Sequence, residues 1–301
     1  MSDNQGHEIW MNVRRRPLAS APSTPWWPDG AIVAVWPVVN VEWFEPGAGG
    51  PAIQPHLMGD PEIANYGWRE YGNRAGLLRL IAVFRAAGIA ASAAINADIC
   101  ARYPALASAI VEAGWEIMGH GQNNSRGLAG LSPQQEREAI ATALETLERH
   151  TGTRPLGWLT PGFSVTARTP EALAACGLRY TADITDDDVP YALETPCGTL
   201  FALPYSLETN DISLCLVGRY TGPEYAHALV DHVRRLVDEG RPVVAALGLH
   251  TYIAGQPGRA LHLERTLHAL QAIRGVWFAT GAEIVARLTS VAGTHNALAE
   301  R

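Results

Sequence analysis

Residues 31–42 read AIVAVWPVVNVE. Ile32–Val39 is a short apolar run rich in β-branched residues, which is typical of a strand buried on both faces of a parallel sheet. The polar residues Asn40 and Glu42 follow the apolar run directly. The stretch therefore predicts a buried strand that ends in polar groups.

Apolar runs of the same kind recur along the chain, and amphipathic runs separate most of them. The further predicted strands are Ala90–Ile95, Trp115–Met118, Gly157–Leu159, Leu200–Leu203, Val243–Leu249 and Val276–Phe278. The predicted helices are Arg74–Ala87, Pro104–Ala113, Ser132–His150, Pro223–Glu239 and Arg259–Arg274. This alternation predicts an α/β fold with a parallel sheet and helices outside it, and we favour a closed or nearly closed barrel.

The chain divides into three predicted parts. Residues 1–30 form an extended N-terminal arm, because Pro17, Pro22, Pro25 and Pro28 interrupt regular structure, and Trp26 and Trp27 are expected to anchor it. Residues 31–288 form the barrel as a single domain, and residues 289–301 form a polar C-terminal tail.

Composition excludes several classes of protein. The 301 residues are 47% hydrophobic and 18% charged, which is too apolar for a disordered chain. The net charge is 23 − 30 = −7, and an acidic chain does not favour nucleic acid or an anionic membrane as a partner. No G-x-G-x-x-G or P-loop motif, targeting segment or apolar run of roughly 20 residues is present. We expect a cytoplasmic protein with a small-molecule substrate.

Polar residues gather after several predicted strands, where barrel enzymes carry their chemistry. His120 and Asn124 follow the third strand, Arg154 and Trp158 flank the start and end of the fourth, and His250 ends the penultimate one. Asp183 and the run Asp186–Asp188 follow a further apolar segment. We expect these groups to converge on the mouth of the barrel.

In these motifs the sequence resembles the polysaccharide deacetylase superfamily, the carbohydrate esterase family 4 fold. The similarity extends over roughly residues 30–288 and implies a single distorted (β/α)7 barrel. The segments closest to the allantoinase-like branch, which hydrolyses cyclic amides, are EYGNRAG at 70–76, RPLGW at 154–158, DDVPY at 187–191, PY at 204–205 with TND at 209–211, GLH at 248–250 and QPGR at 256–259.

The resemblance also exposes departures from the metal-dependent deacetylases, which use two aspartates on the first strand and two histidines four residues apart on the third. Here Asn124 stands four residues after His120. If Glu42 takes the position of the base, Trp43 takes that of the metal ligand; if Glu42 takes the metal position, Asn40 takes that of the base. Because neutral amides bind transition metals poorly, we expect no metal, with zinc at a degenerate site as the alternative.

The predicted chemistry without a metal uses four groups. Glu42, with its pKa raised by burial, is the expected general base, and Arg154 is the expected partner that could orient it. His250 is the expected acid for the departing nitrogen, and His120 could donate to the oxyanion. The substrate-binding residues expected beside these are His120, Asn124, Trp158, Asp187, Tyr71, Arg74 and Arg259.

Three functions remain open from the sequence. The leading one is a hydrolase of non-peptide C–N bonds in a small cyclic amide, imide or ureide. The alternatives are a metal-dependent amino-sugar N-deacetylase that uses Glu42, His120 and Asn124, and a non-catalytic carbohydrate or metabolite binder. The resemblance also implies a homo-oligomer.

Overall fold

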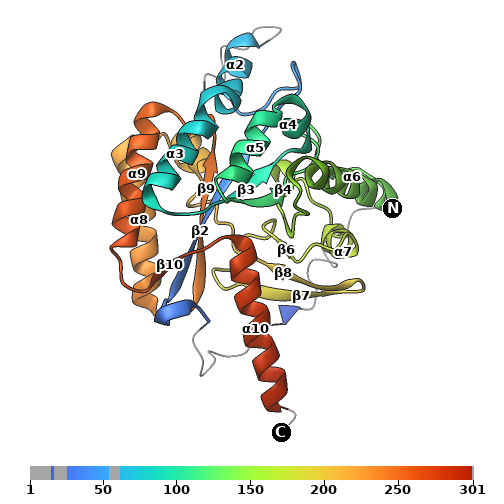
Figure 1. Ribbon diagram of the computed structural model, residues 1–301, viewed down its shortest axis with the longest axis vertical. Coiled ribbons are helices and arrows are strands. Elements are labelled where there is room, and N and C mark those ends of the chain that lie inside the picture. Colours follow the sequence, from blue (N-terminus) through green and yellow to red (C-terminus); the bar gives the residue numbers. More distant parts are fainter. Residues whose placement is uncertain (1–14, 17–25, 54–61, 300–301) are drawn as a thin grey trace.

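The computed structural model of the chain describes residues 15–16, 26–53 and 62–299, with the backbone alone for 15–16 and 292–299 (Figure 1). Most of the predicted N-terminal arm therefore lies outside the described residues. Its anchor is confirmed: Trp26 and Trp27 are buried, and the ring centroid of Trp27 lies 5.7 Å from that of Trp277.

The centre of the molecule is a curled sheet. Its strands are β1 (Arg15–Arg16), β2 (Val33–Val41), β3 (Ser92–Ile95), β4 (Glu116–Gly119), β5 (Gly157–Trp158), β6 (Tyr180–Thr181), β7 (Tyr191–Thr195), β8 (Gly198–Ala202), β9 (Val243–His250) and β10 (Val276–Phe278). Their order is β1-β7-β8-β6-β5-β4-β3-β2-β10, with β9 paired to β2. All pairings are parallel except those of β7 with β1 and β8, as a distorted α/β barrel requires.

The curled sheet closes between β8 and β9 through backbone segments rather than through a regular ladder. The amide of Gly248 donates to the carbonyl of Thr209 at 3.2 Å, and the amide of Val244 donates to the carbonyl of Asp188 at 3.0 Å. The predicted nearly closed barrel is thus confirmed, with one seam completed by loops.

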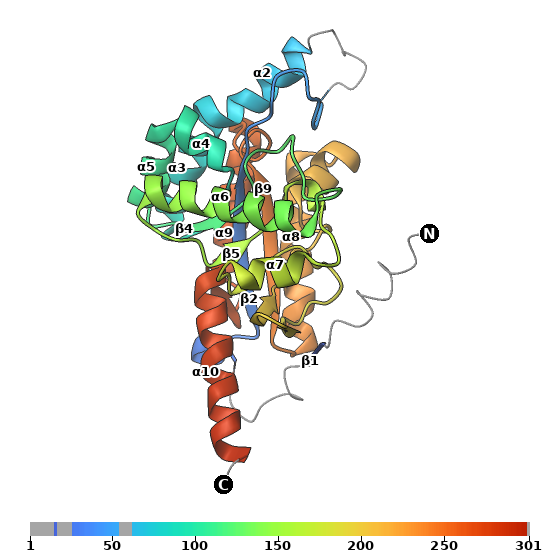
Figure 2. The same ribbon diagram turned by 90° about the vertical axis from the view of Figure 1, so that its right-hand side faces the viewer.

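Helices surround the sheet (Figures 1 and 2). They are α2 (Ile63–Tyr71), α3 (Leu77–Ala87), α4 (Ala97–Arg102), α5 (Pro104–Glu112), α6 (Pro133–Thr151), α7 (Thr169–Ala175), α8 (Gly222–Glu239), α9 (Pro257–Gln271) and α10 (Gly281–Ala299), with the π-helical turns η2 (Gly72–Gly76) and η4 (Ile212–Val217). All five predicted helices form, and Ser132 caps α6 with the expected capping box. Helix α10 continues through residues that we assigned to the polar tail and projects beyond the body of the barrel (Figure 2).

Side-chain alternation along the strands separates two apolar layers. On β2, Trp36 and Val38 point into the barrel, whereas Val35 and Val39 pack against the outer helices. The same alternation directs Asn40 and Glu42 inward at the carboxyl end of β2, since successive side chains of a strand face opposite sides. None of the helices in the described part of the chain combines the length and hydrophobicity needed to span a bilayer.

Candidate active site

A cavity of about 350 Å³ opens at the carboxyl ends of β2, β4 and β9. Its polar lining includes Asn40, Glu42, His120, Asn124 and His250. Its apolar walls include Phe44, Leu159 and Phe163. The volume suits a small molecule, because ligand pockets start at about 300 Å³.

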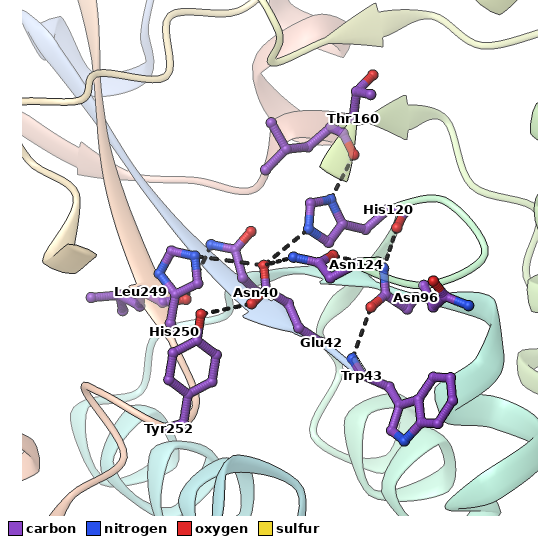
Figure 3. A network of polar contacts seen from close by, with 12 residues as sticks. Asn40, Glu42, Trp43, Asn96, His120, Asn124, Thr160, Leu249, His250 and Tyr252 are labelled. Atoms are coloured by element: carbon purple, nitrogen blue, oxygen red, sulfur yellow. Dashed lines mark hydrogen bonds and ion pairs between the residues drawn. The ribbon is translucent and has the colours of Figure 1, made fainter. Parts of the chain in front are cut away.

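Glu42 lies at the centre of the polar groups (Figure 3). Its Oε1 accepts from Nδ2 of Asn124 at 2.5 Å and lies 3.2 Å from Nε2 of His120 and 3.6 Å from Nε2 of His250. Its Oε2 accepts from the hydroxyl of Tyr252 at 2.8 Å. Four side chains, from the segments at the ends of β4 and β9, therefore orient one buried carboxylate.

These neighbours reverse the expected shift in acidity. Burial by itself raises the pKa of Glu42, but the charge of His250 and the hydrogen bonds from His120 and Tyr252 outweigh it, so the pKa lies below its ordinary value of 4.5. Our expectation of a raised pKa for Glu42 is therefore wrong, because it considered burial without the surrounding donors. The carboxylate is ionised at neutral pH.

His250 is held by Asp211, which precedes η4. Oδ1 of Asp211 lies 2.6 Å from Nδ1 of His250, and Oδ2 accepts from the backbone amide of His250 at 2.7 Å. Burial lowers the pKa of His250, but the negative charges of Asp211 and Glu42 raise it more, so the pKa lies above its ordinary value of 6.5. The arrangement favours a protonated imidazole whose Nε2 faces Glu42.

His120 faces hydrogen-bond acceptors with both ring nitrogens. Its Nδ1 lies 2.6 Å from the carbonyl of Leu159, and its Nε2 lies 3.2 Å from Oε1 of Glu42. Only a ring that carries a proton on each nitrogen can donate both of these bonds. His120 is thus placed as a second donor beside Glu42.

The side chains at this site do not form a set of ligands that fits a metal ion. Nδ2 of Asn124 points to Glu42, and its Oδ1, the atom that could bind a metal, accepts from Nδ2 of Asn96 at 3.1 Å. Among the residues that the structure describes, no group of three or more His, Cys, Asp or Glu side chains is placed to hold a metal. We therefore derive no step through a metal.

Two of the predicted site residues lie away from the cavity. Arg154 is exposed before β5 and pairs with Glu148 at 2.8 Å, so it is not a partner of Glu42. Trp158 is buried in the outer apolar layer, while its neighbour Leu159 faces the cavity. The prediction that Arg154 orients Glu42 is wrong, because Arg154 lies at the opposite end of its strand. The assignment of Trp158 to substrate binding is not supported, because its side chain points to the outer face of the sheet.

Four further predicted contacts are also absent from the cavity lining. Tyr71 accepts from Arg79 at 2.7 Å, and Arg74 is exposed on η2. Asp187 is exposed and accepts from the amide of Val189, as in an Asx turn. Arg259 lies half-buried at the start of α9, beside Cys215. These assignments to substrate binding are not supported, because each residue faces solvent or another element.

The structure adds three residues to which the sequence analysis assigned no role in the site. Asp211 and Tyr252 contact His250 and Glu42, and Tyr205 lines the cavity between them. Tyr252 lies two residues after His250, a spacing that could have drawn attention to it. Asp211 and Tyr205 lie more than 35 residues from any predicted catalytic group, and the segments that contain them were noted for the family resemblance without a role in the site.

Comparisons with known proteins agree with the observed fold. The sequence profile of the polysaccharide deacetylase family matches residues 70–181. A Schizosaccharomyces pombe protein assigned as a polysaccharide deacetylase is 25% identical over 234 residues, which are 71% of this chain and 73% of that protein.

Two solved structures share the whole fold. A Pseudomonas aeruginosa PAO1 protein assigned as a polysaccharide deacetylase is 29% identical, with a TM-score of 0.79 over 88% of this chain and 94% of that one. The Puue allantoinase is 28% identical, with a TM-score of 0.81 over 91% and 96%. In its curled α/β barrel, and in the polar groups at the carboxyl end of that barrel, the chain is similar to hydrolases of the polysaccharide deacetylase superfamily.

Proposed function

We propose that this protein hydrolyses a C–N bond in a small cyclic amide, imide or ureide without a metal ion. The observation that carries the proposal is the arrangement of Glu42 between two histidines, with His250 oriented by Asp211. A carboxylate base and an imidazolium acid are the two groups that amide hydrolysis needs when no metal activates the water. The similarity to an allantoinase also supports this branch.

Each step has an assigned group. Glu42 takes a proton from water as the water oxygen forms a bond to the carbonyl carbon, and His120 donates to the developing oxyanion. His250 then gives its proton to the ring nitrogen as the C–N bond breaks. The products are the ring-opened carboxylic acid and the released N–H group, and one water molecule is consumed. Transfer of the proton from Glu42 to His250, whose Nε2 lies 3.6 Å from Oε1 of Glu42, restores both groups.

The alternative is an amino-sugar N-deacetylase, which the family profile and the curated relative favour. That reaction would use Glu42, His120 and Asn124 around a metal. The orientation of the Asn124 amide argues against it, because its oxygen is bonded to Asn96. The hydrolysis of cyclic imides and ureides is also slowed less by the absence of a Lewis acid than that of an acetamido sugar, since their nitrogen leaving groups are more stable.

A hydrolysis screen tests the proposal. The purified protein is incubated with hydantoin, succinimide and N-acetylglucosamine oligomers, before and after exhaustive treatment with dipicolinate. We expect ring opening that survives the chelator and is abolished by Glu42→Gln. Activity only on the acetylated sugars, lost with chelator and restored by Zn²⁺, would replace the proposal by the metal-dependent alternative.

A further inference from the structure

Asn40 presents a fixed hydrogen-bond acceptor to the cavity. Its Nδ2 donates to the carbonyl of Leu249 at 3.2 Å and to the hydroxyl of Tyr205 at 3.0 Å. Because a carbonyl can only accept, the contact with Leu249 determines which side of the amide is nitrogen. Oδ1 of Asn40 has no donor among the described residues, and Asn40 lines the cavity between His250 and His120 (Figure 3).

Tyr205 presents a hydrogen-bond donor to the cavity. Its oxygen accepts from Nδ2 of Asn40 and from Nδ2 of Asn210, at 3.0 and 3.2 Å. The Asn210 amide is also fixed, since its Oδ1 accepts from the backbone amide of Ile212. With both lone pairs of the hydroxyl occupied, Tyr205 can act toward a ligand only as a donor, and no acceptor for its proton is found in the described part of the chain.

The backbone makes room for this pair. A Cβ atom on Gly248 would lie 2.7 Å from the hydroxyl of Tyr205 and 2.8 Å from Nδ2 of Asn210. Any other residue at this position of β9 would displace both side chains. The glycine two residues before His250 therefore lets Tyr205 and Asn210 lie directly against β9.

An acceptor beside a donor complements one kind of amide. A small ring holds its amide cis, so the ring N–H and the adjacent C=O point to the same side. Acyclic secondary amides are almost entirely trans and present these two groups on opposite sides. We infer that Asn40 and Tyr205 bind the N–H and C=O edge of a cis amide in the substrate ring, which rests on the proposed function and explains selection of rings over acetamido groups.

Substrates that differ by one methyl group test this inference. The parent rings are hydantoin and succinimide, and the comparison compounds are 1-methylhydantoin, 3-methylhydantoin, 1,3-dimethylhydantoin and N-methylsuccinimide. We expect KM to rise at least about tenfold for the compounds that carry no ring N–H, because the buried Oδ1 of Asn40 then loses its donor. One of the two monomethylhydantoins is expected to keep the KM of the parent, and it identifies the bound edge.

Tyr205→Phe removes the donor while keeping the ring. We expect KM for the parent compounds to rise at least about fivefold with kcat changed less than about twofold, and the methylation penalty to shrink, since the two contacts bind one edge. Tyr225→Phe is the control, because that tyrosine is buried and its hydroxyl has no partner in the described structure. It should leave KM unchanged.

The outcomes separate the two proposals. Ring opening with equal KM for methylated and parent compounds would overturn the cis-amide inference and leave the proposed function intact. A Tyr205→Phe variant that loses kcat with unchanged KM would also overturn it, because the hydroxyl would then act in the transition state. A wild-type protein inert toward every ring, but active on acetylated sugars, would overturn the proposed function and this inference with it.

Discussion

Two glutamates lie at opposite ends of the barrel, and their pKa values are shifted in opposite directions. Glu42, after β2 at the carboxyl end, has a lowered pKa, whereas burial raises the pKa of Glu116, at the start of β4, above 4.5. Burial is the largest influence on both carboxyl groups. The difference therefore comes from their neighbours.

Glu116 is surrounded by neutral donors. Its Oε1 accepts from the hydroxyl of Tyr180 at 2.7 Å, its Oε2 accepts from Ser92, and the backbone amides at the start of α10 add to these. None of these groups is a cation, so together they only partly oppose the effect of burial on the pKa. Glu116 thus ties α10 to the sheet.

The two carboxyl groups thus differ in the charge of their partners, which suits Glu42 to the proposed role of base and Glu116 to a structural role. Two histidines placed by separate strands keep Glu42 ionised, which a base requires. Hydroxyl and amide donors hold Glu116 in place and leave its pKa above the ordinary value of 4.5. Substitution of the two residues should therefore separate activity from folding.

The largest expected effect is that of Glu42→Gln on turnover. Glutamine keeps the shape and removes the basicity, and Tyr252 can reverse its hydroxyl to donate or accept, so the fold should persist. We expect kcat to fall by about 10²–10⁴-fold, as is typical of a lost general base. The matched control Glu116→Gln should keep kcat within about twofold. Steady-state kinetics with circular dichroism checks both, and a folded Glu42→Gln protein with near wild-type turnover would contradict the role of Glu42.

His250→Ala is expected to have a smaller and selective effect. A poor nitrogen leaving group needs protonation as the bond breaks, and a good one needs it less. Measured kcat/KM for rings graded by leaving-group pKa should depend more steeply on that pKa in the variant. An unchanged slope together with a lowered melting temperature would instead indicate that His250 only packs at the end of β9.

The pH dependence of kcat/KM should reflect the shifted pKa values of Glu42 and His250. Activity needs Glu42 ionised and His250 protonated, so we expect a bell with an acid limb below pH 4.5 and an alkaline limb above pH 6.5. Asp211→Asn removes one of the charges that raise the pKa of His250, and it should move the alkaline limb to lower pH. An alkaline limb that Asp211→Asn leaves in place would assign this limb to another group.

The smallest expected effect is on stability, and its sign differs between the two glutamates. The lowered pKa of Glu42 stabilises the fold above pH 4.5 and is lost as the pH falls, so the melting temperature of Glu42→Gln relative to wild type should drop as pH rises. The raised pKa of Glu116 costs stability as pH rises above 4.5, so the melting temperature of Glu116→Gln relative to wild type should increase as pH rises. Parallel curves for the two variants would contradict the opposite shifts.

Local patterns in the sequence determined the architecture and the centre of the site. The apolar run before Asn40 and Glu42 predicted β2, and its period of two places both polar residues on the inner side. His120 and His250 were identified because a parallel barrel brings the carboxyl ends of its strands together. These inferences need only contacts between residues close in sequence and a regular topology.

Only the tertiary structure decided which other groups reach Glu42. β5 has two residues, too few to show a period, so the outward parity of Trp158 could not be read from its sequence. Asp211 and Tyr205 reach β9 through an irregular segment that completes the barrel seam, and no periodic signal encodes such a path. The acidity of Glu42 depends on charges contributed from distant parts of the chain, and burial alone predicted the wrong direction.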